Sequence, residues 1–331
     1  MKKFAKILSL IMAIAMIATV FTACQPKDTS ETPEGEAKTY KVGVSIYKYD
    51  DNFMTLYRNE IESYFKSLDS DTAKYEVTLV DANNDMAKQS EQVDTFITQG
   101  VDVLVINLVQ SSSEAAITEK AKAANVPVVY INREPMEENA MDYDKACYVG
   151  ADAKQSGTMQ GKIIADLANK GDVDGDGTVR YVMIMGDPEN IDAQYRTAES
   201  IKALTDAGIT VEKLFEQRGD WDQAKGQELA ANALTQFGAK IDVIFCNNDG
   251  MAMGAMEAIS AAGRKVGEDI YLVGVDAIPE ATDAIKAGTM TGTVLNDHIG
   301  QSHAAVDAAI KYIDGGSNEK KIMIDYQMVT E

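Results

Sequence analysis

The order of apolar segments along the chain limits its fold more than any other feature of the sequence. From Tyr40 onward, short runs rich in valine, isoleucine and leucine alternate with longer segments of helical character. In the first half, the strand candidates are Tyr40–Tyr47, Tyr75–Val80, Val103–Leu108, Val128–Ile131 and Ala146–Val149, and the helix candidates are Phe53–Leu68, Met86–Gln99 and Ser112–Ala124. Because these strand candidates are continuous apolar runs, we expect both faces of their sheet to be covered. Strands that alternate with helices predict a parallel sheet with right-handed crossovers.

The same alternation then begins again and predicts a second lobe of the same kind. Its helix candidates are Ala153–Ala168, Ala193–Ala207, Trp221–Gln236 and Gly250–Ala262, and its strand candidates are Val179–Met185, Ile209–Gln217, Asp242–Asn247 and Ile270–Val275. The expected fold class is therefore α/β, with two similar lobes, each a parallel sheet flanked by helices. Ligands of open parallel sheets bind beyond the carboxyl ends of the strands, so a site is expected there.

The first residues of the chain predict export. Lys2, Lys3 and Lys6 form a positively charged segment before an apolar run over residues 7–20. This run is too short to span a bilayer comfortably. Small and polar residues follow this run at once, as they do in a cleaved signal peptide. We therefore expect residues 1–23 to be a signal peptide. The alternative is a buried hydrophobic helix.

A cysteine that follows this leader predicts attachment to a membrane. Phe21-Thr22-Ala23-Cys24 resembles the lipobox of bacterial lipoproteins, which implies that Cys24 becomes the lipidated N-terminus. Residues 24–39 contain proline, threonine, glutamate and glycine but no large apolar side chain, so we expect a flexible tether. Two acyl chains anchor a protein stably, since each buried CH₂ contributes about 0.8 kcal/mol. The expected location is extracytoplasmic, on the cell surface or in the periplasm.

Charge and residue types exclude several classes of function. A formal net charge of −21 argues against nucleic acid as a partner and against adhesion to anionic lipid head groups. His298 and His303 are the only two histidines, at a spacing that puts them on different faces of a helix, and no nucleophile elbow or phosphate loop is present. Cys147 and Cys246 are expected to be two separate buried thiols. We expect a binding protein and not an enzyme.

Polar side chains follow the strand candidates in both halves of the chain. The candidate site residues are Asp51, Phe53, Asn132, Asn190, Asp192, Arg196, Trp221, Asn248, Asp276 and Asn296. Carboxylate, amide and guanidinium groups can meet neighbouring hydroxyls of a polyol in pairs, and flat aromatic rings suit the apolar faces of a pyranose. Each Asn or Asp taken alone is also explained as a helix cap. Taken together, these residues favour a sugar site.

Four runs of the sequence resemble the galactose/glucose-binding proteins of bacterial ABC transporters, which are type I periplasmic binding proteins. The matching runs are Ile46–Met54, Asn247–Asp249 with Met251–Ala255, Gly274–Ala277 and Gly292–Asp297. The resemblance extends over Tyr40–Glu331. It implies an N-terminal lobe of residues 40–150 plus 297–324 and a C-terminal lobe of residues 151–296 plus 325–331. The lobes would be joined by a three-segment hinge near Ala151, Asn296 and Ile324 and would close on one monosaccharide.

The resemblance also implies roles for the candidate site residues. Sugar contacts fall on the polar residues named above, and Phe53 and Trp221 supply the stacking rings. Asp51 matches the carboxylate that accepts the 4-hydroxyl in either configuration, which admits both glucose and galactose. Asn190 stands where the family has histidine, so the preference between glucose, galactose and their glycosides is left open.

The run Asp172-Val173-Asp174-Gly175-Asp176-Gly177-Thr178 has the spacing of a calcium-binding loop. An EF-hand needs a glutamate at its twelfth position, and this chain has Met183 there. The resemblance implies a structural calcium ion held by Asp172, Asp174, Asp176, Thr178 and Asp242, with Asp242 in place of a distant glutamate. Arg180 stands where the family has a neutral glutamine, so the affinity for Ca²⁺ is expected to be lower than is usual in the family. The alternative is a solvated acidic turn without an ion.

These observations predict an extracytoplasmic lipoprotein that captures galactose or glucose and delivers it to an ABC permease. The expected partners are the monosaccharide, the permease and the membrane, which is reached through the lipid on Cys24. The protein is expected to be a monomer. The alternative is a sensing subunit that presents its closed form to a chemoreceptor or a histidine kinase, because both roles use the same closed state.

Overall fold

The computed structural model describes residues 37–136 and 141–330 and contains two parallel sheets. The larger sheet has the strand order β11-β5-β4-β3-β1-β2. Its strands are β1 (Lys38–Ile46), β2 (Ala73–Asp81), β3 (Val103–Ile106), β4 (Val128–Ile131), β5 (Ala146–Gly150) and β11 (Lys321–Met323). We call this sheet with its helices the N-terminal lobe. The signal peptide, Cys24 and most of the predicted tether lie outside the described residues.

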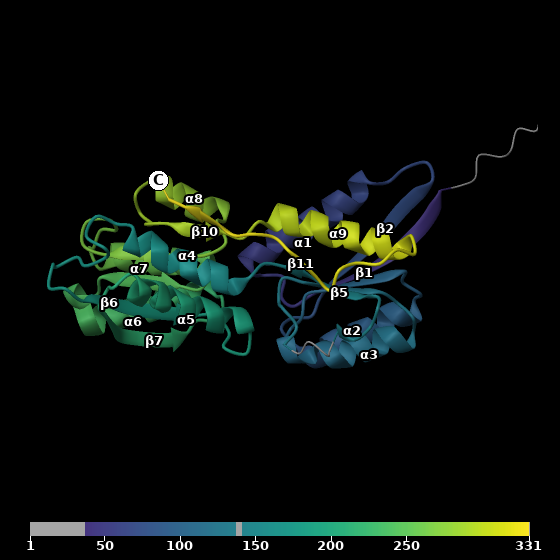
Figure 1. The fold of residues 1–331 in the computed structure, drawn as a ribbon, viewed down its shortest axis with the longest axis horizontal. Helices are drawn as coiled ribbons and strands as arrows, with labels where there is room; N and C mark the ends of the chain where they lie inside the picture. The colour runs from purple at the N-terminus through teal and green to yellow at the C-terminus, as the bar shows by residue number, and fades with distance from the viewer. Residues whose placement is uncertain (1–36, 137–140, 331) are drawn as a thin grey trace, which may run out of the picture. The chain divides into compact units, whose positions relative to one another are not determined.

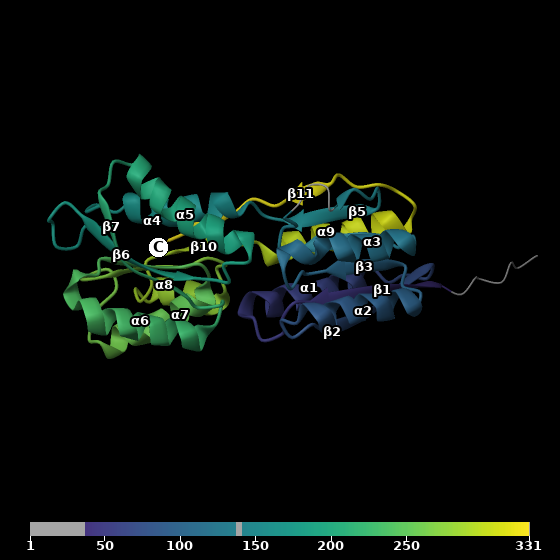
Figure 2. The same ribbon diagram turned by 90° about the horizontal axis from the view of Figure 1, so that it is seen from below.

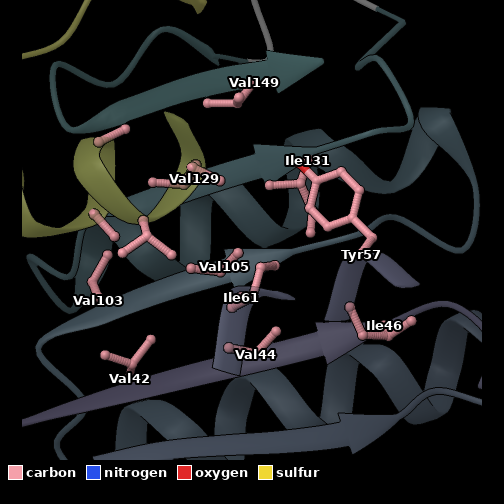
Figure 3. Close-up of a cluster of buried hydrophobic side chains, with 14 of the residues drawn as sticks. Val42, Val44, Ile46, Tyr57, Ile61, Val103, Val105, Val129, Ile131 and Val149 are labelled. Carbon is pink, nitrogen blue, oxygen red and sulfur yellow. The ribbon is translucent and has the colours of Figure 1, made fainter. Parts of the chain in front are cut away.

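Helices cover both faces of this sheet. Figure 1 shows α1 and α9 on one face and α2 and α3 on the other. The bounds are α1 (Asn52–Ser67), α2 (Met86–Thr98), α3 (Glu114–Ala123, after a 3₁₀ turn at Ser111–Ser113) and α9 (His298–Ile313). The strands therefore need apolar side chains in both directions: Val103 and Val105 point to the α1/α9 core drawn in Figure 3, and Leu104 and Ile106 point to the α2/α3 core. The prediction from continuous apolar runs is confirmed.

The second sheet has the order β7-β6-β8-β9 and belongs to the C-terminal lobe. Its strands are β6 (Val179–Met185), β7 (Val211–Arg218), β8 (Val243–Cys246) and β9 (Tyr271–Val273). The helices are α4 (Ala153–Ala165), α5 (Ile191–Asp206), α6 (Gln223–Phe237, followed by a 3₁₀ turn at Gly238–Lys240), α7 (Asp249–Ala261) and α8 (Pro279–Lys286). Figure 2 shows α4 and α5 on one face of this sheet and α6 and α7 on the other.

Glycines allow the helices of the C-terminal lobe to pack in close pairs. A Cβ atom on Gly161 of α4 would lie 2.2 Å from the carbonyl oxygen of Ser200 in α5. A Cβ atom on Gly254 of α7 would lie 2.0 Å from the carbonyl oxygen of Gln223 in α6. Any larger residue would separate these helices, because neither carbonyl can move without the backbone that carries it. The glycines thus fix the positions of helices that carry site residues.

Three segments connect the two sheets. The chain passes from β5 to α4 through Ala151, from β10 (Thr293–Leu295) to α9 through Asn296, and from β11 to β12 (Gln327–Val329) through Ile324. β10 and β12 form a separate antiparallel pair. Short bridges at Val273–Gly292 and Asp276–Leu295 tie β10 to the strand-end region of β9.

Two local expectations are corrected by the structure. Lys38 and Thr39, which were assigned to the tether, open β1 because their backbones pair with Ala73 and Lys74. Trp221 was expected to begin a helix, but it precedes α6, whose N-cap is Asp222. The carboxylate of Asp222 accepts a hydrogen bond from the Lys225 N–H, which places Trp221 in a turn with a positive φ of 65°.

Candidate functional site

One pocket brings together all ten residues predicted from the strand ends. They line it with Tyr47, Met54 and Arg133, so the pocket draws on both lobes. Each residue comes from the region that follows the carboxyl end of a strand, which is where ligands of parallel sheets bind. The empty volume is about 330 Å³, open solvent at its mouth included. The pocket suits a small ligand.

Three of these side chains cap helices and face the pocket at the same time. Asp51, Asn190 and Asn248 are the N-caps of α1, α5 and α7. In each, Oδ1 accepts a backbone N–H, from Met54, Asp192 and Met251 respectively. The capping interpretation and the site interpretation are therefore compatible, since a cap uses only one polar atom of the side chain. For Asn190, the cap occupies the oxygen and leaves the amide N–H₂ group as the donor toward the pocket.

Besides Trp221, two pocket residues adopt backbone conformations that are unusual for residues with a side chain. Asn132 has a φ of 60°, and Asp276 has a φ of 123°, followed by Ala277 at 53°. Such conformations cost on the order of 1–3 kcal/mol each and persist only where surrounding contacts hold them. For Asp276 and Ala277, the buried carboxylate of Asp249 supplies such contacts, accepting bonds from the Ile278 N–H (3.1 Å) and the Thr293 hydroxyl (2.6 Å). Asp249 thus positions Asp276.

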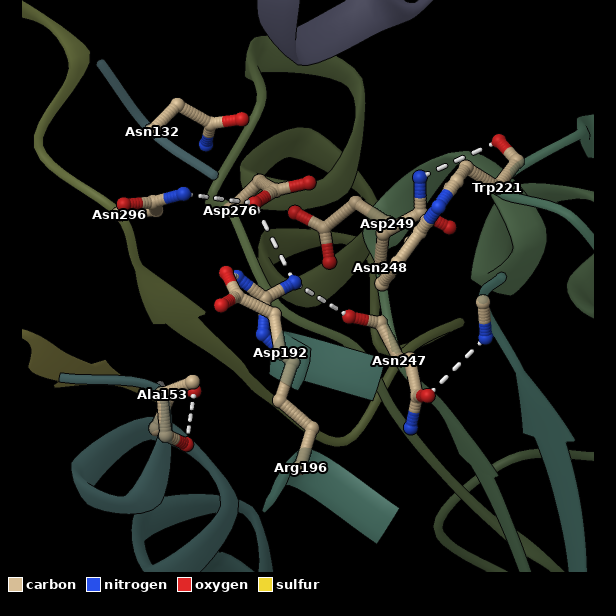
Figure 4. Close-up of polar contacts among 12 residues, drawn as sticks. Asn132, Ala153, Asp192, Arg196, Trp221, Asn247, Asn248, Asp249, Asp276 and Asn296 are labelled. Carbon is tan, nitrogen blue, oxygen red and sulfur yellow. Dashed lines mark hydrogen bonds and ion pairs between the residues drawn. The ribbon is translucent and has the colours of Figure 1, made fainter. Parts of the chain in front are cut away.

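A buried arginine lies at the floor of the pocket. Figure 4 shows Arg196 directed between Asp192 and Asp276, with closest N–O distances of 3.7 and 4.0 Å. Its Nη1 donates to the Asn247 carbonyl oxygen at 2.7 Å, and its Nη2 donates to the Tyr326 hydroxyl at 3.0 Å. Both carboxylate contacts are longer than a hydrogen bond, so the ion pairs are loose.

Burial sets the ionisation of these groups. It raises the pKa of Asp192 to about 6, although Arg196 acts in the opposite direction. Burial also raises the pKa of Asp276 well above its usual value, against the opposing effect of Arg196. For Arg196 itself, burial lowers the pKa, but Tyr326, Asp276 and Asp192 raise it by more, so the guanidinium stays charged. The floor therefore carries one fixed positive charge. The effect of this charge on the pKa values of Asp192 and Asp276 is smaller than the opposing effect of burial.

Two buried donors of the pocket have no hydrogen-bond partner among the described residues. They are Nε of Arg196 and Nε1 of Trp221. A buried donor left without a partner costs about 1–3 kcal/mol, so native proteins rarely keep one without a purpose. A Cβ atom on Gly186 would lie 2.2 Å from the Trp221 ring, so only glycine leaves room for the indole here. The ring position is built into the fold, and its donor is available to a ligand.

Tyr47, Met54 and Arg133 were not among the predicted site residues. The Tyr47 hydroxyl donates to Oδ2 of Asp51, and the Arg133 guanidinium lies 3.6 Å from the centre of the Tyr47 ring. Tyr47 therefore holds the carboxylate of Asp51 in place, and Arg133 covers Tyr47. Both residues stand beside predicted ones in the sequence, so their position next to a strand end was a usable signal. Met54 has no such polar signal.

The acidic loop lies apart from the pocket, between α4 and β6. The carboxylates of Asp172, Asp174 and Asp176 offer oxygens within 4.8 Å of one another. Asp242 is not part of this group: its two oxygens accept the backbone N–H groups of Val173 (3.2 Å) and Arg180 (2.7 Å). The Arg180 side chain extends to the loop carboxylates. These side chains do not fit a free calcium site, because a guanidinium already contacts two of the presumed ligands.

The remaining sequence predictions concern cysteine and histidine. Cys147 and Cys246 are free and buried, as predicted. His298 and His303 are half-buried on α9, where His298 meets the edge of Phe53 and His303 stacks on Tyr64 and pairs with Glu60 at 2.8 Å. None of the helices in the described part of the chain is long and apolar enough to cross a membrane.

Comparison with known proteins places the chain in a family. Residues 42–317 match the model of the periplasmic binding protein domain, so the chain belongs to this family of extracytoplasmic solute-binding proteins. It is a binding protein and not an enzyme, as the sequence predicted. The type I fold predicted from the sequence is confirmed as well.

Three similar proteins illustrate the relationship. The D-galactose/methyl-galactoside binding periplasmic protein MglB of Haemophilus influenzae is 40% identical over 281 residues, which cover 84% of this chain and 82% of that protein. A putative rhizopine-binding protein of Rhizobium meliloti is 35% identical over 291 residues, which cover 88% of this chain and 90% of that protein. An ABC transporter solute-binding protein of Bacillus halodurans, solved with bound myo-inositol, has 29% identity and a TM-score of 0.77, covering 89% of this chain and 96% of that one.

Proposed function

We propose that this protein captures D-galactose and D-glucose outside the cell membrane and delivers them to an ABC importer. The observation that carries the proposal is the composition of the pocket, where carboxylates, amides, two arginines and three aromatic side chains converge from both lobes. Sugar hydroxyls need acceptors such as Asp192 and Asp276, donors such as Asn190, and rings such as Phe53 and Trp221. The 40% identity to a galactose-binding protein supports the same ligand class.

The lipid anchor is the second part of the proposal. The lipobox-like run that ends in Cys24, with the residues that follow it, supports tethering to the outer side of the cell membrane. A protein that is held near its permease raises the local concentration of captured sugar there. Metabolic labelling with an acyl-chain analogue should mark the wild-type protein and leave a Cys24→Ser variant unlabelled. Labelling of both would contradict the anchor at Cys24.

A cyclic polyol is the competing ligand for the same pocket. The Rhizobium meliloti relative is named for rhizopine, and the Bacillus halodurans structure holds myo-inositol. Asn190 bears on this choice because its oxygen already accepts the capping bond of α5, while its N–H₂ group has none of its donors used by that cap. A ligand group that faces this N–H₂ group accepts a hydrogen bond from it, which a ring oxygen or any hydroxyl can do.

Calorimetry of the domain from Lys38 onward tests the proposal directly. We expect galactose and glucose to bind with Kd of about 1 μM or tighter, equivalent to roughly −8 kcal/mol. The fluorescence of Trp221, the only tryptophan, should change on binding, because its indole lines the pocket. Ribose and myo-inositol serve as comparison ligands. No heat with either hexose would overturn the ligand assignment, and tighter binding of myo-inositol would replace it.

Delivery and sensing are separated by a different measurement. A deletion of the gene should reduce uptake of labelled galactose at low concentration if the protein serves an importer. Unchanged uptake together with a lost transcriptional or chemotactic response to galactose would favour presentation of the closed form to a chemoreceptor or a histidine kinase.

A further inference from the structure

Five of the six carboxylate oxygens of the three aspartates in the acidic loop of residues 172–178 accept hydrogen bonds. Both oxygens of Asp172 accept backbone N–H groups, from Gly175 and Gly177, each at 2.9 Å. Oδ1 of Asp174 accepts the Asp176 N–H at 3.2 Å, and Oδ1 of Asp176 accepts the Thr178 N–H at 3.0 Å. Only the outer oxygens of Asp174 and Asp176 then remain.

Arg180 contacts both of these outer oxygens. Its Nη2 lies 2.5 Å from Oδ2 of Asp176, and its Nη1 lies 3.6 Å from Oδ2 of Asp174. On its other side, Nε donates to the Glu212 carboxylate of β7 at 3.2 Å. The guanidinium therefore spans the loop and the neighbouring strand, and its side chain is only 19% exposed. All oxygens of the three loop aspartates have a protein partner.

Asp242 is engaged in the same way beneath the loop. Its carboxylate accepts the N–H groups of Val173, at the start of the loop, and of Arg180, at the end. It fixes the two ends of the loop to β8 through the backbone. A calcium ion needs six to eight oxygen ligands, and Asp242, a fourth carboxylate that faces the backbone, does not supply them while Arg180 contacts the outer oxygens of the loop.

We propose that the Arg180 guanidinium is the resident cation of this loop and takes the structural place of a divalent ion. A guanidinium is always charged and presents several donors in a planar fork, so it can bridge carboxylates on separate segments as a metal ion does. Because it is covalently part of β6, the loop is held at any calcium concentration. The proposal does not depend on the ligand of the pocket.

Replacement of Arg180 by glutamine, a neutral side chain with an oxygen that can bind calcium, tests the proposal. In the wild-type protein, we expect the same Tm in EDTA and in 1 mM CaCl₂ and no calorimetric binding of Ca²⁺. Arg180→Gln should melt about 2–4 °C lower in EDTA, because the loop loses its cation, and should regain stability when CaCl₂ is added. The glutamine has an oxygen where the guanidinium was.

A matched control separates this effect from loss of an ordinary ion pair. Arg264 pairs with Asp269 in the same lobe at 3.3 Å and is 11% exposed. Arg264→Gln should also lower Tm but should show no response to calcium. Stoichiometric binding of Ca²⁺ by the wild-type protein, or an Arg180→Gln variant that melts like the wild type, would overturn the proposal. An Arg180→Gln variant that melts lower and does not respond to calcium would overturn it as well.

Discussion

The C-terminal lobe contains two clusters of aspartates around an arginine, and they differ in how fully their polar groups are satisfied. At the pocket, Arg196 lies 3.7 and 4.0 Å from Asp192 and Asp276, and its Nε has no partner among the described residues. In the acidic loop, five of the six aspartate oxygens accept a hydrogen bond, one of them from Arg180 at 2.5 Å, and the sixth lies 3.6 Å from the same guanidinium. Unused hydrogen-bonding capacity in a buried place indicates a ligand site, whereas a saturated cluster holds the fold together.

The same difference explains why motif spacing alone is a weak guide. The loop has the Asp-x-Asp-x-Asp-Gly pattern that suits a cation, yet a residue two positions beyond the run supplies the positive charge. The pocket has no contiguous motif, and its residues come from seven strand-end regions. Geometry decides which cluster is open to a ligand.

The largest expected effect is the loss of sugar affinity when an aspartate of the pocket is truncated, and the same change in the acidic loop is its control. Asp276→Ala should weaken galactose binding by about 2–5 kcal/mol, at least roughly 30-fold, because it removes an acceptor of sugar hydroxyls and one of the two carboxylates opposite Arg196 in a buried place. Asp174→Ala, the matched change in the acidic loop, should leave the Kd within about twofold. Calorimetry at pH 7.5 measures both. Equal losses in the two variants would remove the distinction between the clusters.

Asp249 gives the next largest effect, although it does not line the pocket. Asp249→Asn replaces a carboxylate that accepts the Ile278 N–H and the Thr293 hydroxyl. The turn at Asp276 and Ala277 should then relax, and galactose affinity should fall by roughly 1–2 kcal/mol, about tenfold. Thermal melting is recorded in parallel. A lower Tm with unchanged affinity would mean that Asp249 stabilises the lobe without positioning Asp276.

Acid should weaken binding through the raised pKa of Asp192, which is about 6 because of burial. Sugar hydroxyls donate to the ionised carboxylate, so a bound sugar favours that form and affinity falls as pH drops below about 6. We expect galactose affinity to fall about tenfold from pH 7.5 to 5, since one proton competes with the ligand. The effect of pH on the stability of the sugar-free protein has the opposite sign. Because the pKa of Asp192 is raised in the folded state, this group stabilises the fold more below pH 6 than above it.

The control for this pH profile is Asp192→Asn. It should bind more weakly than the wild type at pH 7.5 and show a shallower profile, with Asp276 still contributing. A wild-type affinity that stays constant from pH 7.5 to 5 would contradict the assignment of Asp192 as an acceptor of sugar hydroxyls.

The smallest expected effect tests whether the Nε1 donor of Trp221 makes a hydrogen bond to the ligand. Trp221→Phe keeps an aromatic ring and removes the Nε1 donor, so galactose affinity should fall by about 0.5–1.5 kcal/mol, or roughly two- to tenfold. Calorimetry replaces fluorescence here, because the variant has no tryptophan. Affinity equal to that of the wild type would show that the Nε1 donor does not contact the sugar.

Much of the fold follows from local sequence. Apolar runs such as Val103–Ile106 identify buried strands because both faces of each strand are covered by helices. The candidate residues could be named because polar side chains at the carboxyl ends of parallel strands meet at one edge. Short elements were harder: β11, β12 and α8 have three to eight residues and carry too few periodic positions to predict.

The sequence by itself determined the family fold, the polar strand ends and the chemistry they offer. Tertiary structure decided which polar atoms remain free, because that depends on partners far away in the chain. Asn190 loses its oxygen to the cap of α5, Asp276 is held by Asp249, and the acidic loop is closed by Arg180. A hydrogen bond saturates an atom only when the fold brings its partner within about 3 Å, and residue spacing does not record that distance.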